Sequence, residues 1–189
     1  MDYNKYIKQA YETACRNGFH DEEKPMEHWL MLVITEVAEI VEADRKGKHA
    51  QVAMFKRECV TPQPEENKMK HWAYCFECFI KDTMEDEMAD ACIRLFDLAG
   101  MTGWKICVGQ SKKLEEHYSG FFREHTCAEI AWELCRQLTP LYRFGRLDAE
   151  VVLYYIECWA KSEGIDLEWH ICQKMEYNKQ RKRLHGKRY

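Results

Sequence analysis

Two pairs of carboxylates, each set three positions apart inside an otherwise apolar segment, constrain this chain more than any other feature. The first pair is Glu36 and Glu39, and the second is Glu87 and Asp90. In a helix, residues at this spacing share one face and lie about a turn apart. Burying four unpaired carboxylates would be prohibitive without a cation or a shift to their neutral forms. The pattern therefore predicts two buried helices whose acids face each other across a four-carboxylate cage.

The rest of the chain favours helices as well, because apolar residues recur at helical spacing and no stretch alternates convincingly as a strand does. We expect Asp166 to cap the last helix and Gly100 to stop the third. Residues 46–68 should form a long connection, with a short helical piece around residues 53–55. The predicted fold is an all-α helical bundle, with helices over residues 3–17, 26–45, about 70–98, 126–138, 148–162 and from about 166 onward.

Either acid pair alone would be interpreted as charges on a solvent-exposed helix face. The apolar residues around the two pairs argue against that interpretation. Plotted at 100° per residue, Trp29 and Val33 lie on the same side of their helix as Glu36. A helix that is apolar nearly all round is buried, and its acids need partners. Apolar residues also cover most of the third helix and leave one polar stripe, which consists of Thr83, Glu87, Asp90, Arg94 and Asp97.

A chain of 189 residues with 46% hydrophobic side chains suits a single domain, residues 1–189, with an ample core. Residues 101–163 differ in character, since Pro140 and Gly145 separate two helical patterns within them. Neither of these helices alone could bury its apolar face. We therefore interpret the region as a helical hairpin inserted into the domain rather than as a second domain.

Charge and hydropathy narrow the possible partners. The net charge of −4 argues against a globally basic nucleic-acid binder, so nucleic acid is not an expected partner. No apolar run approaches the length of a membrane span, and we expect a cytoplasmic protein with no membrane partner. Its ten cysteines should be reduced. Cys75-x-x-Cys78 lies near His71, but no second pair completes a zinc site, which favours buried thiols.

The residue types around the acids select the ion. Carboxylate oxygens without an imidazole or thiolate beside them suit a hard cation such as Mg²⁺, with Mn²⁺ as a possible substitute. A di-iron bundle would need Glu-x-x-His, and none of the eight histidines follows a Glu or Asp by three positions. The predicted cofactor is therefore Mg²⁺.

With Glu36-x-x-Glu39 followed by Glu87-x-x-Asp90 in apolar helices, the sequence resembles the MazG-like all-α nucleoside triphosphate pyrophosphohydrolases. The resemblance covers roughly the first hundred residues and the last twenty-six. Two departures are the 47 residues between the motifs, more than we expect of compact members, and residues 101–163, which have no counterpart in the smallest ones. The matching terminal segment carries Lys174, Tyr177-Asn178, Arg181 and His185-Gly186-Lys187.

The resemblance implies that a nucleoside triphosphate is hydrolysed between its α and β phosphates, to give the monophosphate and pyrophosphate, by a homodimer or higher homo-oligomer. A carboxylate that is not fully engaged with the metal would take the proton of the attacking water; the sequence does not say which one, and Glu39 is the first candidate for this catalytic role. The implied metal ligands are Glu36, Glu39, Glu87 and Asp90. The implied phosphate-binding residues, which share one helix face at i, i+4 and i+7, are Lys174, Asn178 and Arg181.

Interpretations from other classes stay open. A non-catalytic helical protein that senses nucleotides or binds partners would retain the carboxylate cage for ligand binding and release no product. A nucleic-acid binder with a basic C-terminal tail is the least favoured interpretation, and it predicts binding that weakens steeply with salt. The sequence names neither the base nor the sugar of a substrate.

Overall fold

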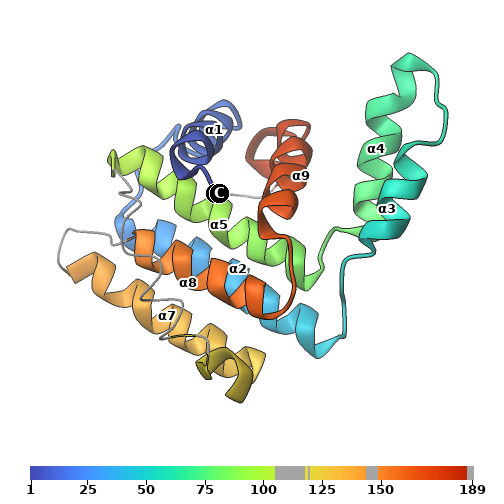
Figure 1. Cartoon of the computed structure of the whole chain (residues 1–189). Helices are drawn as coiled ribbons and strands as arrows, with labels where there is room; N and C mark the ends of the chain where they lie inside the picture. The colour runs from blue at the N-terminus through green and yellow to red at the C-terminus, as the bar shows by residue number, and fades with distance from the viewer. Residues whose placement is uncertain (105–117, 119, 144–148, 187–189) are drawn as a thin grey trace.

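The computed structural model describes residues 1–104, 118, 120–143 and 149–186 of the chain. Within this part all regular structure is helical, which confirms the predicted all-α class. Figure 1 shows the arrangement. The helices are α1 (Tyr3–Arg16), α2 (Met26–Arg45), α3 (Val52–Cys59), α4 (Glu65–Phe79), α5 (Met84–Thr102), α7 (Cys127–Arg143), α8 (Ala149–Ser162) and α9 (Leu167–Lys179), followed by a 3₁₀ turn over Arg183–Gly186.

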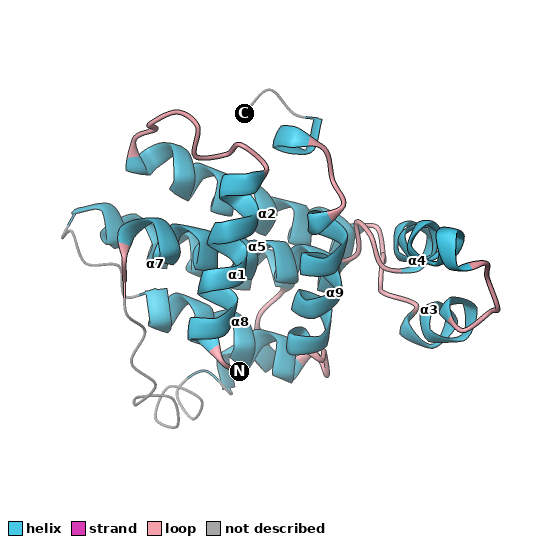
Figure 2. Cartoon of the chain, turned by 90° about the horizontal axis from the view of Figure 1, so that it is seen from above, coloured by secondary structure: helices cyan, strands magenta, loops and turns pink. Residues whose placement is uncertain are grey.

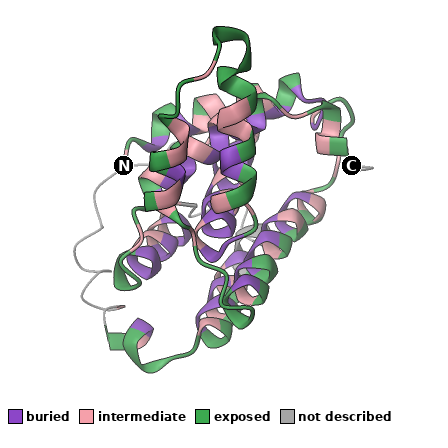
Figure 3. Ribbon diagram, turned by 90° about the vertical axis from the view of Figure 1, so that its right-hand side faces the viewer, coloured by how far each residue is buried: buried purple, intermediate pink, exposed green. Residues whose placement is uncertain are grey.

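Helix α5 lies at the centre of the body of the molecule. It packs against α1, α2, α8 and α9, and α7 packs on α2 and α8. Met88, Leu95 and Phe96 of α5 are fully buried in one hydrophobic cluster that all of these helices share. Figure 3 shows buried residues on the inward sides of the helices and exposed residues on the outer sides. The two acid-bearing helices, α2 and α5, are therefore neighbours in the core, as their motifs predict.

Helices α3 and α4 form an arm that stands away from this body (Figures 1 and 2). Two backbone hydrogen bonds close the base of the arm, from Gln51 N to Phe79 O at 2.8 Å and from Met84 N to Lys48 O at 3.1 Å. The arm has a small core of its own, to which α9 contributes Tyr177, and Trp169 of α9 packs against it. This core consists of Phe55, Cys75, Phe76, Ile80 and Tyr177.

The predicted single helix over about residues 70–98 is wrong, because the chain breaks between α4 and α5. The predicted long connection before it ends too late, since α4 begins at Glu65, but the short helical piece predicted within it around residues 53–55 is confirmed as α3. Asp82 has a φ of 60°, a left-handed conformation that a helix interior does not contain. Thr83 then caps α5, and its hydroxyl accepts a hydrogen bond from Asp86 N at 3.4 Å. Apolar residues continue across the break, so periodicity alone does not reveal it.

Two predicted helix ends also lie elsewhere. Helix α5 continues through Gly100 and ends at Thr102, followed by Gly103 as its C-cap with a φ of 69°. Gly100 serves close packing instead, because a Cβ at this position would lie 2.5 Å from the Cβ of Tyr11 on α1. Helix α7 continues through Pro140, whereas Gly145 lies outside the described residues. The other predicted helices lie within a few residues of their observed bounds.

None of the described helices is both long and apolar enough to cross a bilayer. The described cysteines are all free thiols. In the Cys75-x-x-Cys78 segment, Cys75 is buried with its sulfur 3.6 Å from Nε2 of His71, whereas Cys78 is exposed. No metal-ligating group in the described part of the chain includes either thiol.

Candidate functional site

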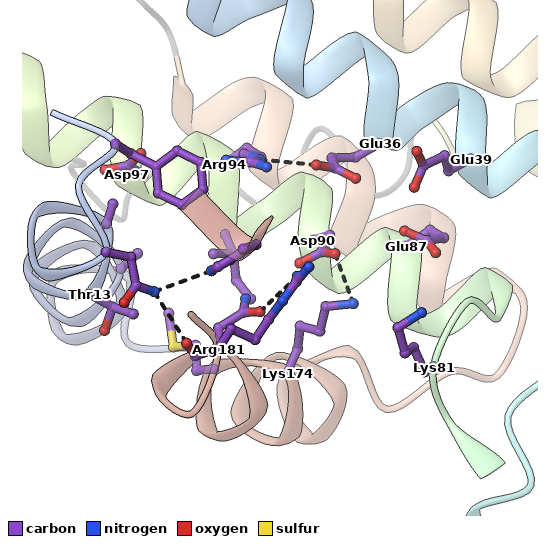
Figure 4. Close-up of a pocket in the computed structure, with 18 of the residues that line it drawn as sticks. Thr13, Glu36, Glu39, Lys81, Glu87, Asp90, Arg94, Asp97, Lys174 and Arg181 are labelled. Carbon is purple, nitrogen blue, oxygen red and sulfur yellow. Dashed lines mark hydrogen bonds and ion pairs between the residues drawn. The ribbon is translucent and has the colours of Figure 1, made fainter. Parts of the chain in front are cut away.

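A cleft opens between α1, α2, α5 and α9, with the turn that precedes α5 at one end. Its volume is about 960 Å³, open mouth included. Figure 4 shows the acids of α2 and α5 along one side and Lys81, Lys174 and Arg181 along the other. The polar stripe predicted on α5 faces this cleft, and the stripe residues that line it are Glu87, Asp90, Arg94 and Asp97.

Three of the four predicted acids come together as a carboxylate cluster. Glu36 and Glu39 lie one turn apart on α2, Glu87 lies on α5, and one oxygen from each lies within 4.8 Å of the other two. Glu36 and Glu87 are buried, whereas Glu39 is exposed. Within the described chain, neither the Glu39 carboxylate nor the Glu87 carboxylate has a hydrogen bond or an ion pair. The structure thus gathers acids from both motifs at one point and leaves two of them open to a ligand.

The surroundings of the carboxylate cluster disfavour its charged state. Burial raises the pKa of Glu87 to about 9, and the neighbouring Asp90 carboxylate adds to the rise. Burial also raises the pKa of Glu36, again with help from Asp90, while Arg94 acts in the opposite direction. Arg94 Nε donates a hydrogen bond to Glu36 Oε1 at 3.0 Å. The Arg94 guanidinium favours a charged Glu36 and the Lys174 ammonium favours a charged Glu87, but burial and the neighbouring carboxylates outweigh both cations.

The donor set of the carboxylate cluster fits a hard divalent cation. All three ligand atoms are carboxylate oxygens, and no imidazole or thiolate of the described chain joins them. Two oxygens bound to one Mg²⁺ lie about 3.0 Å apart when they are cis and about 4.2 Å apart when they are trans. The three oxygens lie within 4.8 Å of one another, so the side chains must draw together by about 1 Å to bind one ion. Glu36, Glu39 and Glu87 are the residues that would hold such an ion.

Asp90, the fourth predicted metal ligand, faces a lysine. Lys174 Nζ lies 2.8 Å from Asp90 Oδ2 and 2.6 Å from Asp86 Oδ2. Burial opposes the charge on the lysine, but the Asp90 and Asp86 carboxylates raise the pKa of Lys174 well above its usual value. Burial likewise works against a charged Asp90, but the ammonium holds the pKa of this carboxyl below its usual value. Asp86, Asp90 and Lys174 form what we name the buried ion triad.

The three predicted phosphate-binding residues line the same cleft from the side of α9. Lys174 is only 3% exposed, and its ammonium is held within the buried ion triad. Asn178 accepts a hydrogen bond on its backbone carbonyl from Asn17 Nδ2 at 3.2 Å. Arg181 lies half-buried beside it, with a long 3.5 Å contact from its guanidinium to Asn178 Oδ1. The structure thus brings the predicted acids and the predicted cations to one cleft, and it pairs Lys174 with acids.

Three residues of the site have no role in the sequence interpretation. Arg94 follows Asp90 by one helical turn within the polar stripe, and this spacing could have predicted that Arg94 lies beside the acids. Asp86 stands in an acidic run, where nothing marks it as the buried member. Lys81 lies in the turn before α5, which the apolar pattern hides. The contact with Lys174 of α9 reveals Asp86, and the lining of the cleft reveals Lys81.

The end of the cleft away from the carboxylate cluster carries Asp97 (Figure 4). His20 Nε2 lies 2.7 Å from Asp97 Oδ1, and the His20 ring stacks on Trp29 with centroids 4.8 Å apart. Burial raises the pKa of Asp97, and the His20 contact opposes this rise. Trp29 is buried, in agreement with the core role that its helix position predicts.

No protein-family model, no curated protein and no solved structure matches this chain. The resemblance to the MazG-like enzymes stays a prediction that rests on the motifs and on their spacing.

Proposed function

We propose that this protein is a Mg²⁺-dependent nucleoside triphosphate pyrophosphohydrolase that cleaves between the α and β phosphates and releases the monophosphate and pyrophosphate. One observation carries the proposal: three acids from two helices, two of them unpaired, share a cleft with several cationic side chains. A site for a triphosphate with its metal requires both groups, since the acids hold the cation and the basic side chains meet the phosphate oxygens.

Each residue then has a role that its surroundings support. Mg²⁺, when bound, would neutralise charge on the phosphate oxygens. Arg94 fixes the orientation of Glu36 through their 3.0 Å hydrogen bond. Glu39 is exposed and unpaired, so its carboxylate is free to take the proton of the attacking water. Asn178 and Arg181 offer an amide and a guanidinium to the phosphate chain.

Pyrophosphate release from a panel of ribo- and deoxyribonucleoside triphosphates, with and without Mg²⁺, tests the proposal. Glu39→Gln and Glu87→Gln should each lower the rate at least about 100-fold, because each replaces a carboxylate that would hold the metal by a neutral amide. Circular dichroism should show unchanged helicity. Glu42→Gln is the matched control, since Glu42 lies on the same helix but is exposed and paired with Lys46 at 2.9 Å. It should retain the activity of the parent protein.

The alternative is a non-catalytic nucleotide-sensing or interaction protein that uses the same cleft. Isothermal titration of Mg²⁺ and nucleotide separates the two, because this alternative predicts tight binding without product. Wild-type turnover in both cluster variants would refute the proposed reaction. The homodimer or higher homo-oligomer that the resemblance implies belongs to the same proposal, and light scattering on the full chain tests it.

A further inference from the structure

We propose that Lys81, in the turn between the arm and α5, binds the outer phosphates of the substrate at the end of the cleft where the carboxylate cluster lies. This inference rests on the proposed function and adds a phosphate-binding residue to it. It also gives a different role to Lys174, which becomes an internal counter-ion rather than a ligand of the phosphates.

The position of Lys81 supports this role. Its side chain lines the cleft, and Figure 4 shows it beside Glu87 on the side opposite Glu36 and Glu39. The side chain is 32% exposed, so the ammonium is accessible from the cleft. A phosphate group held by the carboxylate cluster through a metal would lie within the reach of this long, flexible side chain.

The other cations of the cleft are less available at this end. Lys174 is 3% exposed and lies against Asp86 and Asp90. Arg94 is hydrogen-bonded to Glu36. Arg181 lies nearer the opposite end in Figure 4. Among the described lining residues, Lys81 is therefore the cation best placed to meet phosphates beside Glu39 and Glu87.

The turn that carries Lys81 is held in place by the buried ion triad. Asp86 Oδ2 accepts a hydrogen bond from Asp82 N at 3.0 Å and also meets the Lys174 ammonium. The Thr83 hydroxyl donates a hydrogen bond to Ile80 O at 2.6 Å. Asp82 is a non-glycine residue at a φ of 60°, and such a conformation persists only where the surrounding structure determines it. Asp86 is thus a positioning residue for the turn.

The present partner of Lys81 is one that a phosphate can displace. Its ammonium lies 2.7 Å from Asp82 Oδ1, and the Asp82 side chain is 57% exposed. An exposed pair of this kind contributes little, whereas charge-assisted hydrogen bonds to phosphate are stronger. The ammonium can therefore exchange an exposed carboxylate for the substrate without leaving a buried charge unpaired.

Inorganic pyrophosphate is the probe, and isothermal titration with and without Mg²⁺ is the measurement. Lys81→Ala should raise the Kd for pyrophosphate about tenfold or more, and Lys81→Arg should restore binding to within about threefold. The KM for the triphosphate should rise in parallel. Lys68→Ala is the matched control, because Lys68 lies on the arm and is also paired with one acid, Glu65, outside the cleft. It should leave binding unchanged.

The outcomes separate this inference from the proposed function. If the parent protein releases pyrophosphate from a triphosphate but Lys81→Ala binds pyrophosphate as tightly as the parent does, the role of Lys81 is refuted and the function stands. If Lys81→Ala weakens pyrophosphate binding while the parent hydrolyses no triphosphate of the panel, the function fails and the phosphate-binding role stands. If the parent neither binds pyrophosphate nor hydrolyses, both fail.

Discussion

At the scale of single residues, Lys174 shows what a motif can and cannot predict. Its spacing to Asn178 and Arg181 predicts a shared helix face, and the structure places all three in one cleft. Spacing does not determine burial, however. The Asp86 partner of Lys174 lies 88 positions away in the sequence, and their contact depends on how α9 docks on α5. The location of this lysine was therefore predictable, and its pairing with two acids was not.

Replacing Lys174 by Met should destabilise the protein strongly. The change keeps most of the side-chain volume but leaves the buried Asp86 carboxylate, and its neighbour Asp90, without their cation. Removing one partner of a buried ion pair costs about 3–5 kcal/mol, because the remaining charge stays uncompensated. Urea unfolding in the absence of Mg²⁺, followed by circular dichroism, measures the loss.

The control for Lys174→Met is Lys179→Met on the same helix. Lys179 forms an exposed pair with Glu176 at 2.8 Å, and the loss of such a pair should cost under about 1 kcal/mol. If the two variants lost the same small amount of stability, the buried ion triad would not be an important contributor to the folded state.

At the scale of elements, periodicity predicted α2 well and missed the break before α5. The bounds of α2 follow from its long apolar pattern and from Pro25 at its start. The break carried signals of another kind, because Thr83 is a good N-cap and three acids follow it in the first turn. These local signals compete with an apolar pattern that continues from α4 into α5. The left-handed φ of Asp82, in contrast, has no equivalent in the periodicity.

The contact between α1 and α5 can be tested at Gly100. A Cβ there would lie 2.5 Å from Tyr11 Cβ and 2.9 Å from Tyr11 Cγ. These atoms are close to the backbone of α1, so the helix itself must shift. We expect Gly100→Ala to destabilise the protein by about 1–3 kcal/mol despite the better helix propensity of alanine. Thermal and urea unfolding give the difference.

Gly120→Ala is the counterpart to Gly100→Ala. Gly120 is also helical, and an added Cβ would meet nothing within 4 Å. Here alanine should leave stability unchanged or raise it by up to about 1 kcal/mol. A loss at Gly120 equal to the loss at Gly100 would contradict the close approach of α1 and α5 as the cause.

At the scale of the whole molecule, the fold class and the pairing of α2 with α5 follow from the requirement that buried acids have partners. The arm does not follow from the sequence in the same way. The apolar residues of α4 continue the period of α5, and only the observed contacts show that α4 packs on α3 and α9 instead. The arm core of Phe55, Cys75, Phe76, Ile80 and Tyr177 is separate from the main hydrophobic cluster. This separation predicts that the arm can open while the body stays folded.

Native-state hydrogen exchange can detect this opening, and Phe76 is the side chain to change. It is fully buried, and its ring stacks on the Tyr177 ring with centroids 4.6 Å apart and on the Trp72 ring with centroids 5.7 Å apart. Phe76→Ala should lower the free energy of unfolding of the arm by about 3–5 kcal/mol and have a smaller effect on the body. The amides of α3 and α4 should lose protection while those of α2 and α5 keep most of theirs.

Leu95→Ala, in the main cluster, should instead lower protection throughout the body. If Phe76→Ala lowered protection in α5 as much as in α3, the arm and the body would unfold as one cooperative unit.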